Sequence, residues 1–308
     1  MRNSDADNRL PSDEAGRLMR MATYASISVA CVLIIVKLGA WMATESVSIL
    51  STLLDSLLDA GASMVNLLAV RRALQPADRN HRFGYGKAEP LAGLAQAAFI
   101  CGSAMILLIQ AGDRFFHPRP VHSAEIGYAV MLLAIVLTIG LVLFQKHVVS
   151  KTGSVAISGD SLHYQTDVMI NASVIFSLFL SSRTGWMMFD PLFAIAIAGY
   201  IVFGARDIGR DALRLLMDRE LPEEERRRIK EIALSQPGAL SMHDLRTRSS
   251  GMMTFIQLHL EMDGDITLRE AHEIAEAVMH KLENAFPNAE VIIHEDPKGV
   301  MEKRVEFK

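Results

Sequence analysis

Two pairs of ionisable side chains lie inside long apolar stretches of this chain. Asp55 and Asp59 occur in SILSTLLDSLLDAGASMVNLL, and His163 and Asp167 occur in GDSLHYQTDVMIN. A separation of four residues places both members of a pair on one face of a helix, about 40° apart around its axis. Charges in such apolar surroundings are costly unless a partner or a ligand compensates them. The two pairs are therefore candidates for a functional site.

If the two helices face each other, they present three carboxylates and one imidazole. This donor set suits a divalent cation of intermediate softness, and tetrahedral Zn²⁺ is the best match. The alternative is that the acids line a solvated cavity or cap a kinked helix. Two matched pairs in separate apolar segments favour cation transport over that alternative. Asp160 is left out of the predicted site, because it is expected near a membrane face as an entrance or capping residue.

The composition fits a membrane protein. Of the 308 residues, 50% are hydrophobic and only 21% are charged, whereas soluble domains carry nearer a quarter of charged residues. The net charge of −4 shows no basic excess, so nucleic acid is not an expected partner. Cys31 and Cys101 both lie in apolar stretches, which argues against a disulfide framework or a thiolate metal site.

The apolar residues before Arg206 form six segments, each predicted to be a transmembrane helix. A bilayer core of roughly 30 Å needs about 20 helical residues. The segments are Met21–Ala43, Val47–Val70, Leu91–Gly112, Ile126–Phe144, Val155–Leu180 and Leu192–Ala205, the last extending to about Arg214. The polar stretch Met1–Gly16 does not have the composition of a cleaved signal peptide.

Lys and Arg residues in the loops and at the helix ends are concentrated on one side of the predicted membrane domain. The other side holds only Arg114, Arg119 and Arg183. Because positive charge accumulates on the cytoplasmic side, both termini are expected in the cytoplasm. An even number of spans agrees with that orientation.

A small soluble domain is predicted to follow the sixth span. Pro222–Ser235 reads as a helix with Pro in its first turn. The rest of the region predicts two strands, a helix and a strand: Leu240–Ser249, Met253–Met262, Leu268–Phe286 and Glu290–His294. The order αββαβ is typical of a small open sheet backed by two helices, an α+β domain. The predicted boundaries are a tail at 1–16, the six-helix domain at 17–215, the soluble domain at 216–300 and a tail at 301–308.

Three segments of the chain resemble the cation diffusion facilitator family, in particular its bacterial zinc and iron efflux transporters. The segments are SVSILSTLLDSLLDAGAS, QPADRNHRFGYGKAEPLA and GDSLHYQTDVMINASV, and the resemblance runs from about Ala22 to Pro297. It implies a homodimer of six-helix protomers with a cytoplasmic metallochaperone-like domain, exchanging Zn²⁺ for protons across a bacterial inner membrane. The family's intramembrane site falls on Asp55, Asp59, His163 and Asp167, the residues selected above by spacing.

The resemblance also implies a metal site in the loop between spans two and three, built from an Asp and two His. Asp78 and His81 match it, but Tyr85 stands where the family has the second His. A phenol with a pKa near 10 is a poor Zn²⁺ ligand at neutral pH. This site is therefore weakened, completed by another group, or absent.

A binuclear cytoplasmic metal site is implied as well. Imidazoles with a bridging carboxylate can hold two Zn²⁺ ions close together. The matching residues are His243, His259, His272, His294 and Asp296. His280 has no match and is expected at the surface. Lys87 and Asp218 resemble a family pair that links the third span to the end of the sixth at the membrane–cytoplasm boundary.

The expected function is proton-coupled export of Zn²⁺, with Cd²⁺ and Fe²⁺ as further substrates and no enzymatic cofactor. His163 favours Zn²⁺ or Cd²⁺, because Mn²⁺-type family members tend to have Asp there. No Walker A motif is present, so a proton gradient rather than ATP is the natural driving force. An intramembrane metalloprotease would need H-E-x-x-H, which fails after His272. A membrane-anchored metal sensor would have no reason to bury the charged quartet.

Overall fold

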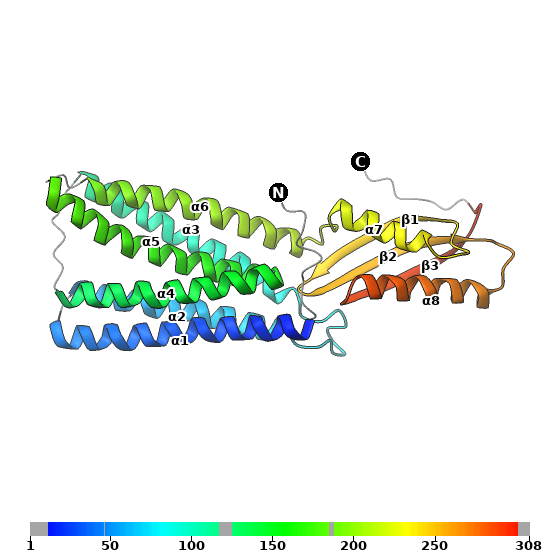
Figure 1. Ribbon diagram of the computed structural model, residues 1–308, viewed down its shortest axis with the longest axis horizontal. Helices are drawn as coiled ribbons and strands as arrows, with labels where there is room; N and C mark the ends of the chain where they lie inside the picture. The colour runs from blue at the N-terminus through cyan, green and yellow to red at the C-terminus, as the bar shows by residue number, and fades with distance from the viewer. Residues whose placement is uncertain (1–11, 46, 117–124, 185–187, 301–308) are drawn as a thin grey trace. The chain divides into compact units, whose positions relative to one another are not determined.

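The computed structural model describes residues 12–45, 47–116, 125–184 and 188–300 (Figure 1). The chain divides into two compact units, Met1–Leu213 and Arg214–Lys308. Most of the predicted terminal tails, and Arg119 of the predicted outer loops, lie outside the described residues.

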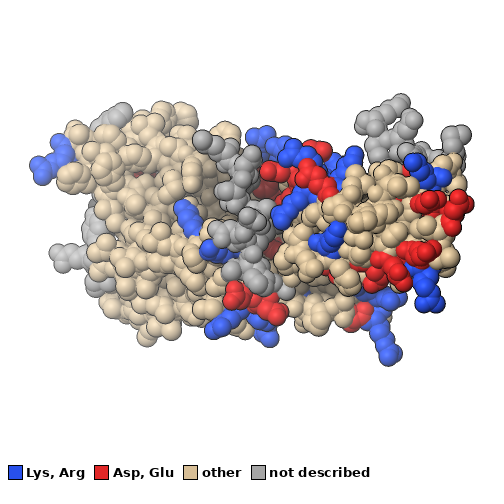
Figure 2. Space-filling view, turned by 45° about the vertical axis from the view of Figure 1, so that its right-hand side comes forward, with Lys and Arg blue, Asp and Glu red and all other residues tan. Residues whose placement is uncertain are grey.

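The first unit is a bundle of six long helices, and each contains most or all of one predicted span. They are α1 (Ser12–Thr44), α2 (Val47–Ala73), α3 (Ala88–Phe116), α4 (Glu125–Thr152), α5 (Val155–Thr184) and α6 (Phe189–Leu216). Within the described residues, all but α5 are long and apolar enough to cross a membrane. The helix α5 matches them in length but carries the polar residues of the candidate site. Figure 2 shows that the visible face of this unit is mostly uncharged. The polytopic helical architecture predicted from the sequence is confirmed.

Contacts between the helices bring α2 and α5 together. The helix α1 packs against α2 and α4, and α5 packs against α3, α4 and α2 (Figure 1). The helix α6 approaches α5 at Gly204, where an added Cβ would lie 2.8 Å from a methyl carbon of Leu162. Small residues at such crossings allow helices to approach closely in a membrane.

The start of α5 is fixed by side chains on both sides of it. The Ser154 hydroxyl accepts the backbone N–H of Ile157 at 3.2 Å, which is a helix N-cap contact. The buried Glu89 of α3 accepts the backbone N–H of Val155 at 2.9 Å. Beside this contact, a Cβ added to Gly93 of α3 would lie 2.7 Å from Val155 Cγ1. These contacts fix the position of α5 along the axis of α3, and with it the positions of the side chains that follow on α5.

The second unit is a three-stranded sheet with two helices, in the predicted αββαβ order. Its elements are α7 (Glu223–Leu234), β1 (Ser241–Ser250), β2 (Met253–Met262), α8 (Leu268–Ala285) and β3 (Ala289–Pro297). The strand order is β1-β2-β3, with β1 antiparallel and β3 parallel to β2. β3 is longer than predicted and reaches Pro297, so Asp296 lies within the strand.

Alternation along β2 gives the sheet two different faces. Ile256, Leu258 and Leu260 are buried in the core with Val278 and Leu282 of α8. The intervening residues of β2, His259 among them, therefore point to the opposite face. The capping box of Thr267 and Glu270 fixes the start of α8.

We predict that Gly93→Leu separates α3 from α5 and lowers the unfolding free energy by about 1–3 kcal/mol, because the added side chain has no space there. Gly102→Leu on the same helix is the matched control, since among the described residues no atom beyond the adjoining backbone of α3 lies within 4 Å of a Cβ added at Gly102. Thermal unfolding of the purified proteins in detergent measures both. Equal shifts for the two variants would contradict the close α3–α5 crossing.

Candidate metal centres

The first centre lies between α2 and α5. Ligand atoms of Asp59, His163 and Asp167 all lie within 4.8 Å of one another. His163 Nε2 is 2.9 Å from Asp59 Oδ1 and 3.8 Å from Asp167 Oδ2. The His163 side chain is 7% exposed, whereas those of Asp59 and Asp167 are 20% and 30% exposed. An imidazole is thus held between two carboxylates that remain partly accessible, as a site that exchanges an ion requires.

Asp55 lies one turn before Asp59 and is exposed. Among the described residues it is not part of the cluster formed by the other three. A separation of four residues moves it about 6 Å along the helix axis, which accounts for its distance from the ligand atoms. The structure therefore brings together three residues of the predicted quartet, and Asp55 stays a predicted fourth ligand.

Asp160 is the sixth residue of α5, and its expected place near a membrane face stays a prediction, but its surroundings are not those of an open entrance. It is buried, one turn before His163. The Ser26 hydroxyl of α1 donates to Asp160 Oδ2 at 2.6 Å, and the Gln145 amide of α4 donates to the same oxygen at 2.7 Å. The Ser63 hydroxyl of α2 lies 3.4 Å from Oδ1. Donors from three neighbouring helices compensate the burial, so Asp160 fastens α5 to the bundle.

The second centre lies on the sheet face opposite the core. Strand pairing places His243, His259 and His294 at one level on β1, β2 and β3. Asp296 Oδ2 is 2.8 Å from His259 Nδ1 and 3.5 Å from His243 Nε2, and Asp296 Oδ1 is 2.8 Å from His294 Nδ1. Three of the four predicted histidines are therefore gathered around the buried carboxylate of Asp296, the fifth predicted residue.

Glu261 is a further acid at this centre that the motifs did not indicate. Its Oε1 lies 3.2 Å from His243 Nδ1, and its Oε2 accepts the Ser241 hydroxyl at 2.6 Å. Neither ring nitrogen of His243 makes a well-aligned hydrogen bond among the described residues, although both are buried. A ring with Nε2 toward the cluster and Nδ1 toward a carboxylate has the usual environment of a metal-binding histidine. Strand alternation could have indicated Glu261, which follows His259 by two residues on the same face.

His272, the remaining predicted ligand, makes no hydrogen bond or ion pair with the cluster around Asp296 among the described residues. It is on α8, 66% exposed, with its ring nitrogens 4.0 Å from Glu276 Oε1 and 3.9 Å from Glu295 Oε1. Its role as a ligand stays a prediction. His280 is also 66% exposed on α8, at the surface as expected.

In the loop between α2 and α3, Asp78 is held by several hydrogen bonds, and the metal site expected there stays a prediction. Asp78 accepts the backbone N–H groups of Asn80 and His81, both at 2.8 Å, and the Tyr85 hydroxyl at 2.5 Å. The guanidinium of Arg72 lies over the Tyr85 ring, 3.8 Å from its centroid. The Tyr85 hydrogen bond is the main cause that lowers the pKa of Asp78 to about 2. The same bond raises the pKa of Tyr85, so the phenol stays neutral and acts as a donor.

Lys87 and Asp218 belong to different units of the chain. Lys87 directly precedes α3, and Asp218 follows α6 with its Oδ1 3.5 Å from Arg248 Nη1. Their pairing stays a prediction.

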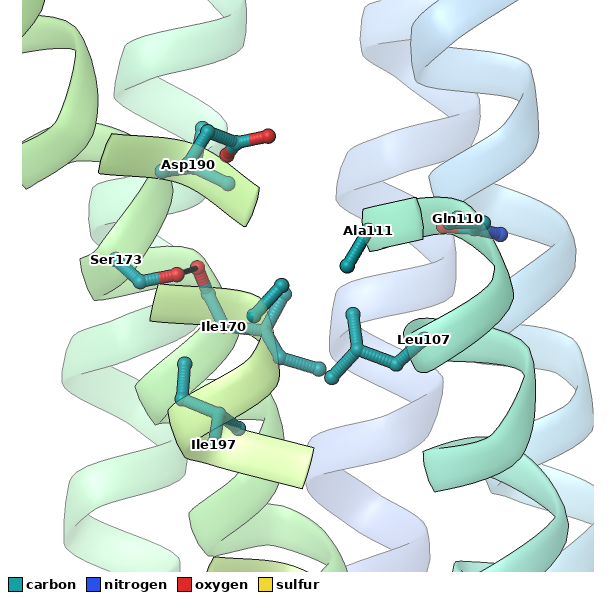
Figure 3. A pocket seen from close by; sticks show the side chains of 9 residues that line it. Leu107, Gln110, Ala111, Ile170, Ser173, Asp190 and Ile197 are labelled. Atoms are coloured by element: carbon teal, nitrogen blue, oxygen red, sulfur yellow. Dashed lines mark hydrogen bonds between the residues drawn. The ribbon is translucent and has the colours of Figure 1, made fainter. Parts of the chain in front are cut away.

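A cavity of about 100 Å³ lies between α3, α5 and α6 (Figure 3). Leu107 of α3 and Ile170 of α5 point toward each other across it, and Asp190 lies at its edge on α6. Ile170 and Val174 follow Asp167 by three and seven residues, so the cavity lies along the same face of α5 as the first centre. Its volume corresponds to about three water molecules.

A bundle of membrane-spanning helices with a cluster of cation ligands, joined to a small domain with a second cluster, defines a multi-pass transporter of metal cations. Comparison with family models agrees: the cation efflux transmembrane domain matches residues 23–217, and the cytoplasmic domain of cation efflux proteins matches residues 221–298. The chain belongs to the cation efflux family, which confirms the resemblance noted in the sequence.

Relatives match over almost the whole chain. The cation-efflux pump FieF of Shewanella oneidensis is 49% identical, and the match covers 92% of this chain and 95% of the relative. FieF of Klebsiella pneumoniae is 48% identical over 93% of this chain and 95% of its own. A solved structure of CzrB in its Zn form is 35% identical over 28% of this chain and 99% of that chain, with a TM-score of 0.26. These relatives are named as transporters, and this chain is a transporter rather than an enzyme.

We predict that Glu261→Gln weakens Zn²⁺ binding at the cytoplasmic centre by about 10–100-fold, because it removes the negative charge that lies 3.2 Å from His243 Nδ1. Titration of the full-length protein carrying Asp59→Asn isolates this centre from the intramembrane one. Glu283→Gln, on the exposed surface of α8, is the control and should leave the affinity unchanged. An unaltered affinity in Glu261→Gln would show that the acid does not support His243.

We also predict that Tyr85→His adds a Zn²⁺ ion per protomer or tightens a weak site, because it removes the phenol from Asp78 and supplies an imidazole. Even without the Tyr85 hydrogen bond, an aspartate with an ordinary pKa of about 3.9 stays charged at neutral pH, so the added binding should strengthen as pH rises through about 6.5, where imidazoles lose their protons. Equilibrium dialysis with metal analysis measures the stoichiometry, with Tyr85→Phe as the control. Equal stoichiometry and affinity in both variants would mean that the loop is no metal site.

Proposed function

We propose that this chain exports Zn²⁺ from the cytoplasm in exchange for protons, as a homodimer that works by alternating access. Cd²⁺ and Fe²⁺ are further substrates in this proposal. The observation that carries it is the contact of His163 with Asp59 and Asp167, because it forms a cation site between two helices of the membrane domain. The concentration of Lys and Arg on one side supports cytoplasmic termini, and the bacterial relatives support an inner-membrane location.

The choice of Zn²⁺ follows from the donor atoms. One imidazole nitrogen with two or three carboxylate oxygens is a mixed set that suits Zn²⁺ and Cd²⁺, whereas Mn²⁺ prefers oxygen alone. Affinity for a given site also rises from Fe²⁺ to Zn²⁺ in the usual order of the divalent metals.

Proton coupling is supported by His163 Nε2, the ring nitrogen that faces Asp59. A hydrogen bond over the 2.9 Å between Nε2 and Asp59 Oδ1 needs a proton between the two atoms. A metal ion bound by the same nitrogen must displace that proton. Metal and proton therefore exclude each other at one ring nitrogen, which is the condition for exchange. Protons on the outer side would then favour release of the metal.

The cavity along α5 offers an exit route in this proposal. Gln110, Ser173 and Asp190 provide oxygen atoms around it for a partly hydrated ion. The cytoplasmic centre has a separate role: metal bound there would stabilise one geometry of the soluble domains and shift the membrane bundle toward the corresponding state.

We predict that Asp59→Asn abolishes Zn²⁺ flux while the protein still purifies as a folded dimer, because it removes a ligand without changing the size of the side chain. Proteoliposomes loaded with a Zn²⁺-sensitive dye measure the flux, with and without a pH gradient. The wild-type flux should rise when the trans side is acidic and fall when an ionophore collapses the gradient. Glu290→Gln, on β3 of the soluble unit, is the matched control for loss of one carboxylate.

Undiminished flux in Asp59→Asn would overturn the intramembrane site. Wild-type flux that ignores the gradient would overturn antiport and leave a passive carrier.

A further inference from the structure

Lys37 is a charged residue of α1 that the ligand set does not include. It lies seven residues before the end of the helix, within the first candidate membrane span. Its Nζ donates to the backbone carbonyl oxygen of Thr52 at 3.0 Å and to the hydroxyl of Ser56 at 2.7 Å, both on α2. Charged side chains at such positions are costly and usually serve the transported ion or its counter-charges.

The two contacts hold the ammonium group beside the candidate cation ligands of α2. Thr52 and Ser56 are four residues apart and share one side of the helix. Asp59 follows Ser56 by three residues, about 4.5 Å along the axis, and so lies on that same side. Asp59, Asp167 and Asp55 are close enough for their charges to act on Lys37.

A role in helix packing alone does not account for a lysine at this position. A neutral amide could donate to the Thr52 carbonyl and the Ser56 hydroxyl without the cost of bringing a charge into the membrane domain. What the ammonium adds is a fixed positive charge next to a cluster of acids. That charge matters most when the cluster holds no metal, because the acids then repel one another.

We propose that Lys37 is a tethered counter-cation, which balances the carboxylates of the metal-free intramembrane site and repels the divalent ion that replaces it. The proposal deepens the proposed function, on which it rests, by assigning a residue that keeps metal binding weak enough for release. A transport site must bind its ion and also let it go. Lys37 sets that balance without contacting the metal.

Equilibrium binding of Zn²⁺ to the full-length dimer in detergent tests the proposal. All proteins carry Asp296→Asn, which removes the shared carboxylate of the cytoplasmic cluster, and the isotherm that Asp59→Asn abolishes identifies the intramembrane site. Lys37→Gln, which keeps the donors and removes the charge, should lower the dissociation constant at this site by about tenfold or more, because Coulomb repulsion is strong where the dielectric constant is low. Lys37→Arg, which keeps the charge, should stay within about threefold of the parent protein.

Lys37→Met removes both charge and donors, and it should tighten binding as much as Lys37→Gln does. Lys146→Gln, at an exposed position of α4, is the matched control for loss of one lysine and should have no effect. Gel filtration checks that each variant remains a folded dimer. Unchanged or weaker binding in Lys37→Gln, or equal changes in Lys37→Gln and Lys37→Arg, would overturn the counter-cation role.

The two proposals fail in distinguishable ways. Absence of metal flux in wild-type proteoliposomes would overturn the exporter, whereas the binding series reports on Lys37 without any gradient or transport.

Discussion

The contact between His163 of α5 and Asp59 of α2 is the interaction on which the membrane domain depends. Neither group is stable in apolar surroundings unless the other, or a metal ion, lies beside it. The two helices must therefore meet at this height, and much of the bundle can be understood as the means to hold them there. Glu89 and Ser154 fix where α5 begins, and Gly93 lets α3 come close enough for that contact.

Two acids of α5, Asp160 and Asp167, differ in the groups that surround them. Asp160 is surrounded by hydroxyl and amide donors, so its carboxyl oxygens are satisfied inside the protein and it contributes to the assembly of the bundle. Asp167, two turns later, meets an imidazole that already contacts Asp59. In this cluster, hydrogen-bond acceptors outnumber donors. The missing positive charge is supplied by a proton, by Lys37 in our proposal, or by a metal ion. One helix thus carries a buried acid whose partners are all protein groups and, two turns later, a candidate metal ligand, and the two differ in their neighbours.

Periodicity was enough to predict the elements, and spacing the candidate ligands of the membrane unit, whereas those of the soluble unit were implied by the resemblance to the family. Apolar segments located the six helices, and the spacing of four residues selected Asp55, Asp59, His163 and Asp167, of which the structure groups the last three. What could not be predicted depends on contacts between segments far apart in the sequence. The donors to Asp160 come from three other helices, Lys37 reaches α2 through groups that are neutral, and Glu261 is defined by its distance from His243 on another strand. The extension of β3 to Asp296 likewise follows from pairing with β2 rather than from its own composition.

The two centres are built on supports of different stiffness, and this difference bears on what each can do. The candidate ligands of the soluble unit sit on three strands whose hydrogen bonds fix their register, so the spacing of His243, His259 and His294 changes little unless the sheet itself opens. Those of the membrane unit come from two separate helices joined through side chains only, and a small shift of α2 against α5 changes every ligand distance at once. Such a site can switch between binding and release with a modest movement. The centre on the sheet suits lasting occupancy, and the centre between helices suits an ion in transit.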